Sequence, residues 1–192
     1  MIKTKADLRR CLNNEREFYL PHSNKWKIIL ESENRYKIYK YIKLLRKTEY
    51  HYNNKNNLFH RLMYAIKKRK KNILGRKLGI EMWENSFDEG LRIEHSGNIV
   101  VNGHARIGKN CILHGSNCIG NDGLSSMTPR IGDNVRIGVG AKIIGDVEIA
   151  DNVIVAAGAV VIKSCDVPYA VLSGVPAKIV KIKSKDNMNE CV

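Results

Sequence analysis

Three histidines near the middle of the chain, His95, His104 and His114, are residues whose type could do acid–base chemistry. Neutral imidazole can accept a proton near neutral pH, because its unperturbed pKa is about 6.5. His95 follows Ile93 by two residues and can lie at an exposed edge, although this spacing alone is also typical of a surface histidine on a corner. His114 could line a cleft or cap a corner, and His104 is expected to be a surface residue in a turn.

A general base needs an acidic residue to orient it, and several carboxylates precede His95. Glu94 is adjacent, but neighbouring residues in a strand point to opposite faces. Glu81 lies fourteen residues before His95, and Glu84 and Asp88 are also near. The spacing therefore leaves the acidic partner open.

The cysteines predict neither a disulfide framework nor a metal site. The five are scattered and include no CxxC pair, which is typical of free thiols in a reducing compartment. Metal-ligand spacing is absent, so we predict no metal. We also expect no signal peptide and no membrane span, because the first twelve residues are charged and no apolar run approaches about 18 residues. The predicted location is the cytoplasm.

The formal net charge of +14 lies almost entirely in residues 1–80. Its densest cluster is Lys67–Lys71, and a second follows from Lys178 to Lys185. Such an excess of positive charge suits an anionic partner. A Lys- and Asn-rich composition without functional meaning would explain the excess equally well. No nucleic-acid-binding signature accompanies the cluster, so we predict no nucleic acid. A minor hypothesis is that residues 65–71 touch anionic lipid as a basic amphipathic helix.

The element that must position the histidines is a repeat of six residues from Leu91 to Val161. Position i is aliphatic, position i+1 is usually Gly or Ala, and position i+4 is small or β-branched. The aliphatic positions are Ile93, Ile99, Val101, Ile107, Leu113, Ile119, Ile131, Ile137, Ile143, Ile149, Val155 and Val161. A period of six fits neither a helix nor a simple strand alternation, but it fits a solenoid in which three hexads form one coil.

The remaining chain is divided around this repeat. We predict an N-terminal helical segment over residues 1–80, the repeat domain over 81–180 and a charged tail over 181–192. Helices are expected over Lys5–Tyr19, from Glu33 to about Tyr50, and from about Leu58 to Leu74, with residues 75–80 closing the last. The repeat breaks phase beside His95 and carries a loop over residues 121–130, and such irregularities are where sites tend to be built.

The repeat resembles that of the hexapeptide acyltransferases, whose fold is a left-handed parallel β-helix and which are usually trimers. The ending Ser173-Gly174-Val175-Pro176-Ala177-Lys178-Ile179-Val180 is similar to the terminal motif of acetyl-CoA-dependent members. The stretch from Leu91 to Val101 is similar to the segment that holds the catalytic histidine of serine acetyltransferases. The block from Tyr41 to Tyr50 resembles the helical front of a sub-branch found among capsule and lipopolysaccharide genes.

This resemblance implies a role for each candidate residue. His95 would be the general base, and Glu81 matches, with a one-residue gap, the acid that orients it. His114 could line the cleft near the thioester. The coenzyme A arm would lie in a groove between subunits, around Val139 and Ala157. The full set of predicted coenzyme-binding residues is Gly138, Val139, Ala157, Lys163, Lys178 and Lys181, of which the lysines would meet the phosphates.

The acceptor is the least determined part of the prediction. Serine acetyltransferases carry an Arg-His pair in the loop that corresponds to residues 121–130, whereas this chain has Arg130 and no histidine there. Their helical front is also longer than that of this chain. We therefore predict a trimeric, acetyl-CoA-dependent O-acetyltransferase acting on a sugar hydroxyl of a surface polysaccharide or its precursor. Serine O-acetylation is the alternative, and a non-catalytic β-helix scaffold is the rival from another class.

Overall fold

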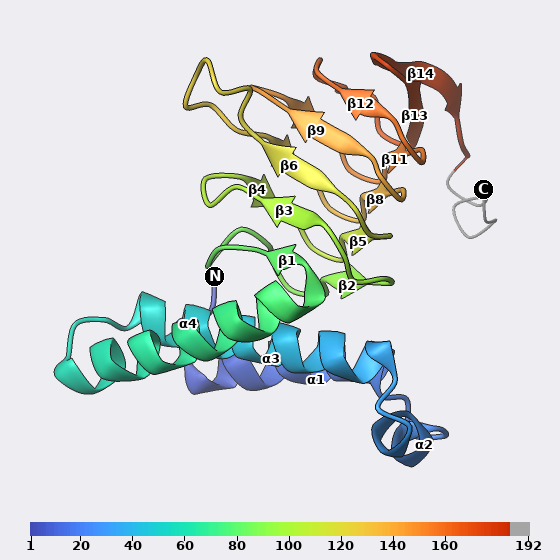
Figure 1. Ribbon diagram of the computed structural model, residues 1–192. Helices are drawn as coiled ribbons and strands as arrows, with labels where there is room; N and C mark the ends of the chain where they lie inside the picture. The colour runs from blue at the N-terminus through green and yellow to red at the C-terminus, as the bar shows by residue number, and fades with distance from the viewer. Residues whose placement is uncertain (185–192) are drawn as a thin grey trace.

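The computed structural model describes residues 1–184, and in it a β-helix stands on a layer of α-helices (Figure 1). The predicted tail lies outside the described residues from 185 onward, as does Cys191. The two parts are a left-handed parallel β-helix and an N-terminal helical segment, as the hexads and the resemblance predicted. Among residues 1–184, no helix is long and apolar enough to cross a membrane.

Four helices form the N-terminal layer: α1 (Lys5–Tyr19), α2 (Lys25–Leu30), α3 (Asn34–Asn53) and α4 (Leu58–Leu78). The predicted first helix is confirmed, and Thr4 caps it by accepting a hydrogen bond from the amide of Asp7 at 3.0 Å. The sequence missed the short α2. It also ended the last helix too early, because α4 continues through Gly75 and stops at Gly79, which adopts a left-handed φ of 65°.

The strands are short and stack into three parallel sheets. Their bounds are β1 (Ile80–Glu81), β2 (Arg92–Ile93), β3 (Ile99–Val101), β4 (Arg106–Ile107), β5 (Ile112–Leu113), β6 (Cys118–Gly120), β7 (Arg130–Ile131), β8 (Arg136–Ile137), β9 (Lys142–Ile144), β10 (Glu148–Ile149), β11 (Ile154–Val155), β12 (Val160–Val161), β13 (Ala170–Gly174) and β14 (Ala177–Ile182). Sheet A has the order β1-β3-β6-β9-β12, sheet B the order β10-β7-β4, and sheet C the order β14-β13-β11-β8-β5-β2. Only β14 runs antiparallel to its neighbour, as the return strand after β13.

The pairing register confirms that three hexads make one coil. Ile137 pairs with Val155, eighteen residues later, and both side chains are fully buried. Ile119 pairs with Ile143, twenty-four residues later, so the loop over 121–129 adds one hexad without breaking phase. Ile93 pairs with Leu113, twenty residues later, which is the two-residue slip seen in the sequence. The aliphatic positions of the repeat therefore form the buried core of the β-helix.

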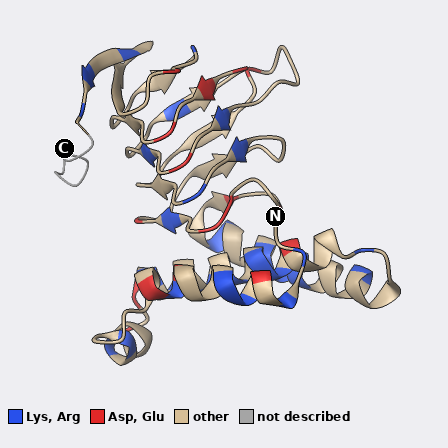
Figure 2. Cartoon of the chain, turned by 180° about the vertical axis from the view of Figure 1, so that it is seen from behind, with Lys and Arg blue, Asp and Glu red and all other residues tan. Residues whose placement is uncertain are grey.

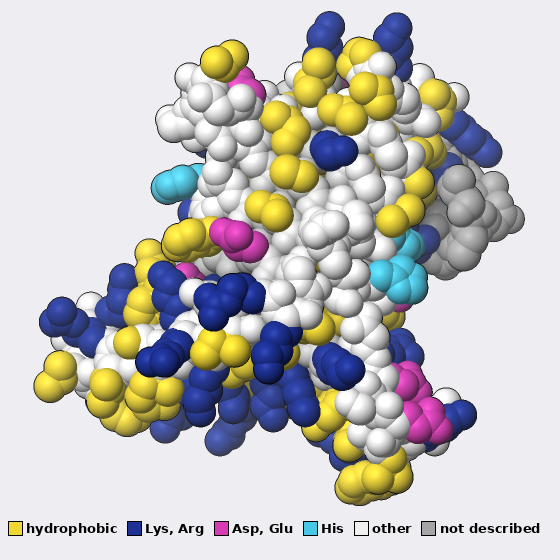
Figure 3. All heavy atoms as spheres, in the orientation of Figure 1, with side chains coloured by type: hydrophobic (Ala, Val, Ile, Leu, Met, Phe, Trp, Pro, Cys, Tyr) yellow, Lys and Arg dark blue, Asp and Glu magenta, His cyan; other side chains and the backbone are white. Residues whose placement is uncertain are grey.

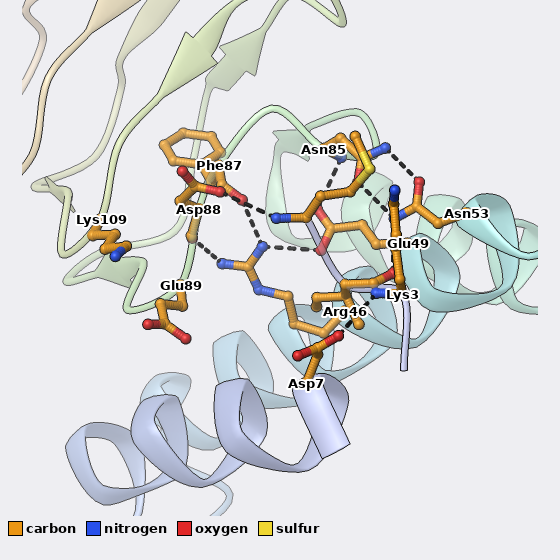
Figure 4. A network of polar contacts seen from close by, with 12 residues as sticks. Lys3, Asp7, Arg46, Glu49, Asn53, Asn85, Phe87, Asp88, Glu89 and Lys109 are labelled. Atoms are coloured by element: carbon orange, nitrogen blue, oxygen red, sulfur yellow. Dashed lines mark hydrogen bonds and ion pairs between the residues drawn. The ribbon is translucent and has the colours of Figure 1, made fainter. Parts of the chain in front are cut away.

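A buried arginine joins the helical layer to the first coil (Figure 4). The Arg46 side chain of α3 is 1% exposed and donates to Glu15 Oε1 of α1 at 2.7 Å and to Glu49 Oε2 at 2.9 Å. It also donates to the backbone oxygens of Phe87 and Asp88 at 2.8 and 2.6 Å. Burial alone would lower the pKa of Arg46, but the charges of Glu49 and Glu15 outweigh it and hold this pKa well above its ordinary value.

A second buried ion pair fixes α4 against the base of the β-helix. Lys71 Nζ lies 2.7 Å from Glu84 Oε1 and donates to the backbone oxygen of Met82 at 2.8 Å. Both side chains are almost fully buried. Lys71 belongs to the densest basic cluster of the sequence, yet it faces inward, so the cluster is divided between a packing face and an outer face.

Removing the Arg46 side chain should unfold the junction between the two parts. Arg46→Met leaves two carboxylates buried without a counter-charge, and we expect the free energy of unfolding to fall by about 3–5 kcal/mol. Chemical denaturation measures this change. Arg10→Met is the matched control, because Arg10 is exposed while pairing with Glu89 at 3.2 Å, and it should leave stability nearly unchanged. Equal stability of the two variants would show that the buried network does not hold the junction.

Candidate active site

His95 lies in the turn that leads from β2 in sheet C to β3 in sheet A, and its side chain is exposed. We call this side of the β-helix the C–A edge, defined by the stacked turns over residues 94–98, 114–117, 138–141 and 156–159. The structure therefore places His95 at an edge position, as the sequence suggested.

The register brings most of the predicted site residues to this edge. Ile93, Leu113, Ile137 and Val155 pair in successive coils. The residues two positions after them therefore form one column along the C–A edge, and these are His95, Gly115, Val139 and Ala157. The residues one position after them form the neighbouring column, and these are Glu94, His114, Gly138 and Ala156. His114 thus lies one coil above Glu94 and beside the His95 column.

The backbone of the C–A edge is tightly stacked. The amide of Gly140 donates to the oxygen of Gly115 at 2.9 Å, and that of Gly158 donates to the oxygen of Val139 at 2.9 Å. Gly115 has a φ of 111°, and a Cβ there would lie 3.1 Å from the backbone oxygen of His95. A larger residue would be strained and would crowd the His95 turn. Above it, Val139 keeps 52% of its surface exposed and lines the edge.

Glu81 lies on the outer face of sheet A rather than at the C–A edge. It pairs with Val100 and lines a cavity of about 400 Å³ together with Asn98 and Ile99. Among residues 1–184, no hydrogen bond joins His95 to Glu81 or to Glu94. The assignment of Glu81 as the orienting acid stays a prediction, and so does a catalytic role for His114.

The three predicted phosphate-binding lysines are divided between edges. Val155 pairs with Leu172 of β13, and the next residue, Ser173, pairs with Lys178 of β14. Lys178 therefore lies at the far end of the C–A edge. Lys181 pairs with Val171, farther along the same hairpin. Lys163 follows β12 in the turn that leads away from sheet A, on another edge. One copy of the chain therefore does not bring Lys163 to the residues around His95.

The sequence missed a buried asparagine that shapes the C–A edge. Asn117 is fully buried, accepts a hydrogen bond from the amide of Gly115 at 3.0 Å and donates to the oxygen of Gly138 at 2.7 Å. It fixes two successive turns of the edge with one side chain. Its signal was present, since it stands four residues after Leu113, where the repeat normally has a small or β-branched residue.

The helical layer also supports the His95 turn directly, which spacing did not reveal. The hydroxyl of Tyr19 at the end of α1 accepts a hydrogen bond from the amide of Ile93 at 2.6 Å. Ser96 Oγ donates to Asn34 Oδ1 at the start of α3 at 3.1 Å. The guanidinium of Arg92 lies 4.8 Å from the ring centre of Phe18. These contacts hold β2 and its following turn from below.

Of the residues that the structure describes, no group of three or more His, Cys, Asp or Glu side chains could hold a metal ion. The cysteines 11, 111, 118 and 165 are free. Burial raises the pKa of the Cys111 thiol, which is fully enclosed in the core of the β-helix. It is a packing residue in the position where the repeat needs a small side chain.

Comparison with known proteins agrees with this architecture. Residues 128–163 match the family described as bacterial transferase hexapeptide (six repeats). The fold, the repeat and this match show that the β-helix is of the hexapeptide-repeat kind.

Serine acetyltransferases are among the proteins similar to this chain. One from Staphylococcus xylosus is 34% identical over 134 residues, which are 64% of this chain and 61% of the relative, so the chain spans less than two thirds of its length. A solved serine acetyltransferase from Neisseria gonorrhoeae shares the fold with a TM-score of 0.72 and 23% identity, covering 92% of this chain and 68% of that one. Another, solved in complex with CoA, has a TM-score of 0.68 and 22% identity over 92% of this chain and 71% of that one.

We expect Tyr19→Phe to loosen the His95 turn without breaking the fold. The variant leaves the buried amide of Ile93 without its acceptor, so stability should fall by about 1–3 kcal/mol. Hydrogen exchange of the Ile93 amide, followed by NMR, should become faster than in the parent. Tyr39→Phe is the matched control, since Tyr39 packs near Tyr19 with ring centres 6.0 Å apart. Unchanged exchange of Ile93 in Tyr19→Phe would contradict the supporting role of α1.

Proposed function

We propose that the chain is an acetyl-CoA-dependent O-acetyltransferase in which His95 is the general base. The observation that carries the proposal is the C–A edge, where an exposed histidine shares one column with Val139 and Ala157 and the edge ends at Lys178. Acetyl transfer from coenzyme A requires a base, a smooth groove for the long flexible arm of the coenzyme, and a cation for its phosphates.

The chemistry assigns a simple path to the proton. The neutral imidazole of His95 takes the proton of the acceptor hydroxyl while the hydroxyl oxygen attacks the thioester carbonyl. The tetrahedral intermediate then breaks its carbon–sulfur bond, and the proton passes from His95 to the departing coenzyme A thiolate. Backbone amides of the stacked turns are the groups that can meet the oxyanion. Glu81 is proposed to orient His95, and His114 to line the cleft near the thioester.

The coenzyme is proposed to lie along the C–A edge. Gly138, Val139 and Ala157 would flank the pantetheine arm. Gly138 itself lets the coils stack closely, because a Cβ there would clash with the backbone of Ala156 and Ala157. Lys178 and Lys181 would bind the phosphates. Lys163 lies on another edge, so it can serve the same groove only where two copies of the chain meet. This division of the lysines supports a homotrimer with shared grooves, as in the hexapeptide acyltransferases that the sequence resembles.

Serine is the acceptor that we propose first. The similar proteins are serine acetyltransferases, and their likeness favours serine over the sugar hydroxyl expected from the capsule-type resemblance. A sugar acceptor is kept as the second candidate because of one feature, the loop over 121–130. It contains Arg130 but no histidine, so the pair that binds the amino acid in serine acetyltransferases is incomplete here.

Removing the proposed base should stop catalysis and spare coenzyme binding. We expect His95→Ala to lower kcat by about 10²–10⁴-fold, the usual contribution of general base catalysis. Release of free coenzyme A thiol measures turnover, and thermal stabilisation by coenzyme A measures binding. His104→Ala is the control, since His104 is exposed in the turn between β3 and β4. Turnover of His95→Ala close to that of the control would refute the assignment.

An acceptor screen decides between serine and sugars. Free thiol release from acetyl-CoA is followed with L-serine, with D-serine as its matched control, and with mono- and oligosaccharides. We expect L-serine to give saturable turnover that D-serine does not. Saturable turnover with a saccharide and none with L-serine would replace the first candidate by the second. Thermal stabilisation by coenzyme A without turnover on any acceptor would leave only a binding scaffold.

A further inference from the structure

The outer face of α4 exposes a stripe of large apolar side chains. Leu58, Phe59, Leu62, Ile66 and Ile73 keep 79, 63, 59, 39 and 39% of their surfaces exposed. At 3.6 residues per turn these five positions fall within an arc of about 100° on one side of the helix. Figure 3 shows hydrophobic side chains gathered at the left end of the helical layer, where α4 begins.

Exposed cations without counter-charges lie within this stripe and beside it. Arg61, Arg69, Lys70, Arg76 and Lys77 are all exposed on α4. In total, α4 contains eight Lys and Arg residues and no Asp or Glu. Within residues 1–184, none of the five exposed cations forms an ion pair. We call this apolar stripe together with the five cations the α4 outer face.

The cationic surface continues from α4 onto α3. Burial and the charges of Lys43 and Lys67 lower the pKa of Lys47, which shows lysines of the two helices close together without acidic partners. Lys37, Lys40 and Lys43 are also exposed along α3. Figure 2 shows Lys and Arg along the helical layer, and Figure 3 shows them lining its lower side.

Packing within residues 1–184 leaves this surface uncovered in whole or in part. The opposite side of α4 is the one that packs, with Lys71, Gly75 and Leu78 buried and Lys71 neutralised by Glu84. This ion pair fixes the rotation of α4, so the outer face is held outward. An apolar stripe exposed on a rigid helix is unfavourable in water, so it indicates a partner.

We propose that the α4 outer face docks on the surface of an anionic lipid bilayer. The helix lies parallel to the membrane plane, with Leu62, Ile66 and their neighbours in the boundary between headgroups and acyl chains. The Arg and Lys side chains meet lipid phosphates, and each contributes to binding through the negative surface potential. This proposal is independent of acetyl transfer and makes no use of His95.

Charge argues against a second copy docked through this same face, and the apolar stripe argues against a nucleic acid. A second copy docked through the same face would bring five unpaired cations against an identical set, and like charges in contact repel. A nucleic acid would match the cations, but it would leave Leu58, Phe59 and Leu62 without an apolar partner. An anionic bilayer is the partner that matches both components of the face.

The first test is co-sedimentation of the full chain with vesicles. We expect the protein to bind vesicles of equimolar phosphatidylglycerol and phosphatidylcholine, to bind vesicles of phosphatidylcholine alone far more weakly, and to dissociate as salt is raised. Absence of binding to the anionic vesicles, or equal binding to both, would overturn the proposal.

Two double variants, each with a control variant, then test the apolar stripe and the cations of the face separately. Leu62→Gln with Ile66→Gln should weaken vesicle binding about tenfold or more. Leu124→Gln, in a β-helix loop and 94% exposed, should not change it. Arg69→Gln with Lys70→Gln should weaken binding about fivefold for each cation removed. Lys109→Gln with Lys142→Gln, which removes two exposed cations of the β-helix, should have a much smaller effect.

Light scattering and thermal unfolding complete the test. We expect all four variants to keep the melting temperature and the particle mass of the parent. Parent-like vesicle binding by Leu62→Gln with Ile66→Gln would overturn the proposal, because the apolar stripe would then be unused. A lower particle mass of this variant, without vesicle binding by the parent, would assign the face to a second copy and would equally overturn it.

Discussion

The buried guanidinium of Arg46 is the interaction on which the arrangement of the two parts depends. It bonds to carboxylates of α1 and α3 and to two backbone oxygens of the first coil, so a single charge joins three segments of the chain. A buried charge is costly unless it is paired and hydrogen-bonded, and here its partners come from both sides of the junction. Displacement of either part would leave an unpaired charge in the interior, which makes the relative placement of helices and β-helix specific.

This placement matters for the site because the first coil carries His95. A β-helix ends in an open coil, whose strands have neighbours on one side only. Here the helical layer covers that end, and Tyr19 and Asn34 bond to β2 and the turn after it. The remainder of the C–A edge is held differently, by the ladder of successive coils and by Asn117 inside the turns. Helices and repeat therefore meet at the residue that we propose as the base.

The sequence predicted the parts that depend on local periodicity. The hexads predicted which aliphatic residues stack in the core of the β-helix and how many residues form each coil. They could do so because every coil places the same steric requirements on its residues. The family resemblance, not the period, singled out Val139 and Ala157, and the strand pairing puts them in one column with His95. The period could not place Glu81, which the structure puts on the outer face of sheet A, lining a cavity together with Asn98. Its role in orienting His95 stays a prediction.

What the sequence could not predict lies across long separations or in deviations from the pattern. Tyr19 and Ile93 are seventy-four residues apart, and no spacing rule joins a helix end to a strand amide. The last helix was expected to end near Leu74, yet tertiary packing carries α4 on to Leu78, with Gly79 as its cap. The basic cluster around Lys67 was visible, but only the fold separates Lys71, which is buried, from the cations that face outward.

A crystal structure of the chain with coenzyme A bound tests the central claim, that the C–A edge is the site of acetyl transfer. We expect the pantetheine arm to run beside Val139 and Ala157, with its sulfur within about 4 Å of the His95 imidazole and so within reach of one proton transfer. An arm bound on another edge, with its sulfur far from His95 of every copy, would contradict it.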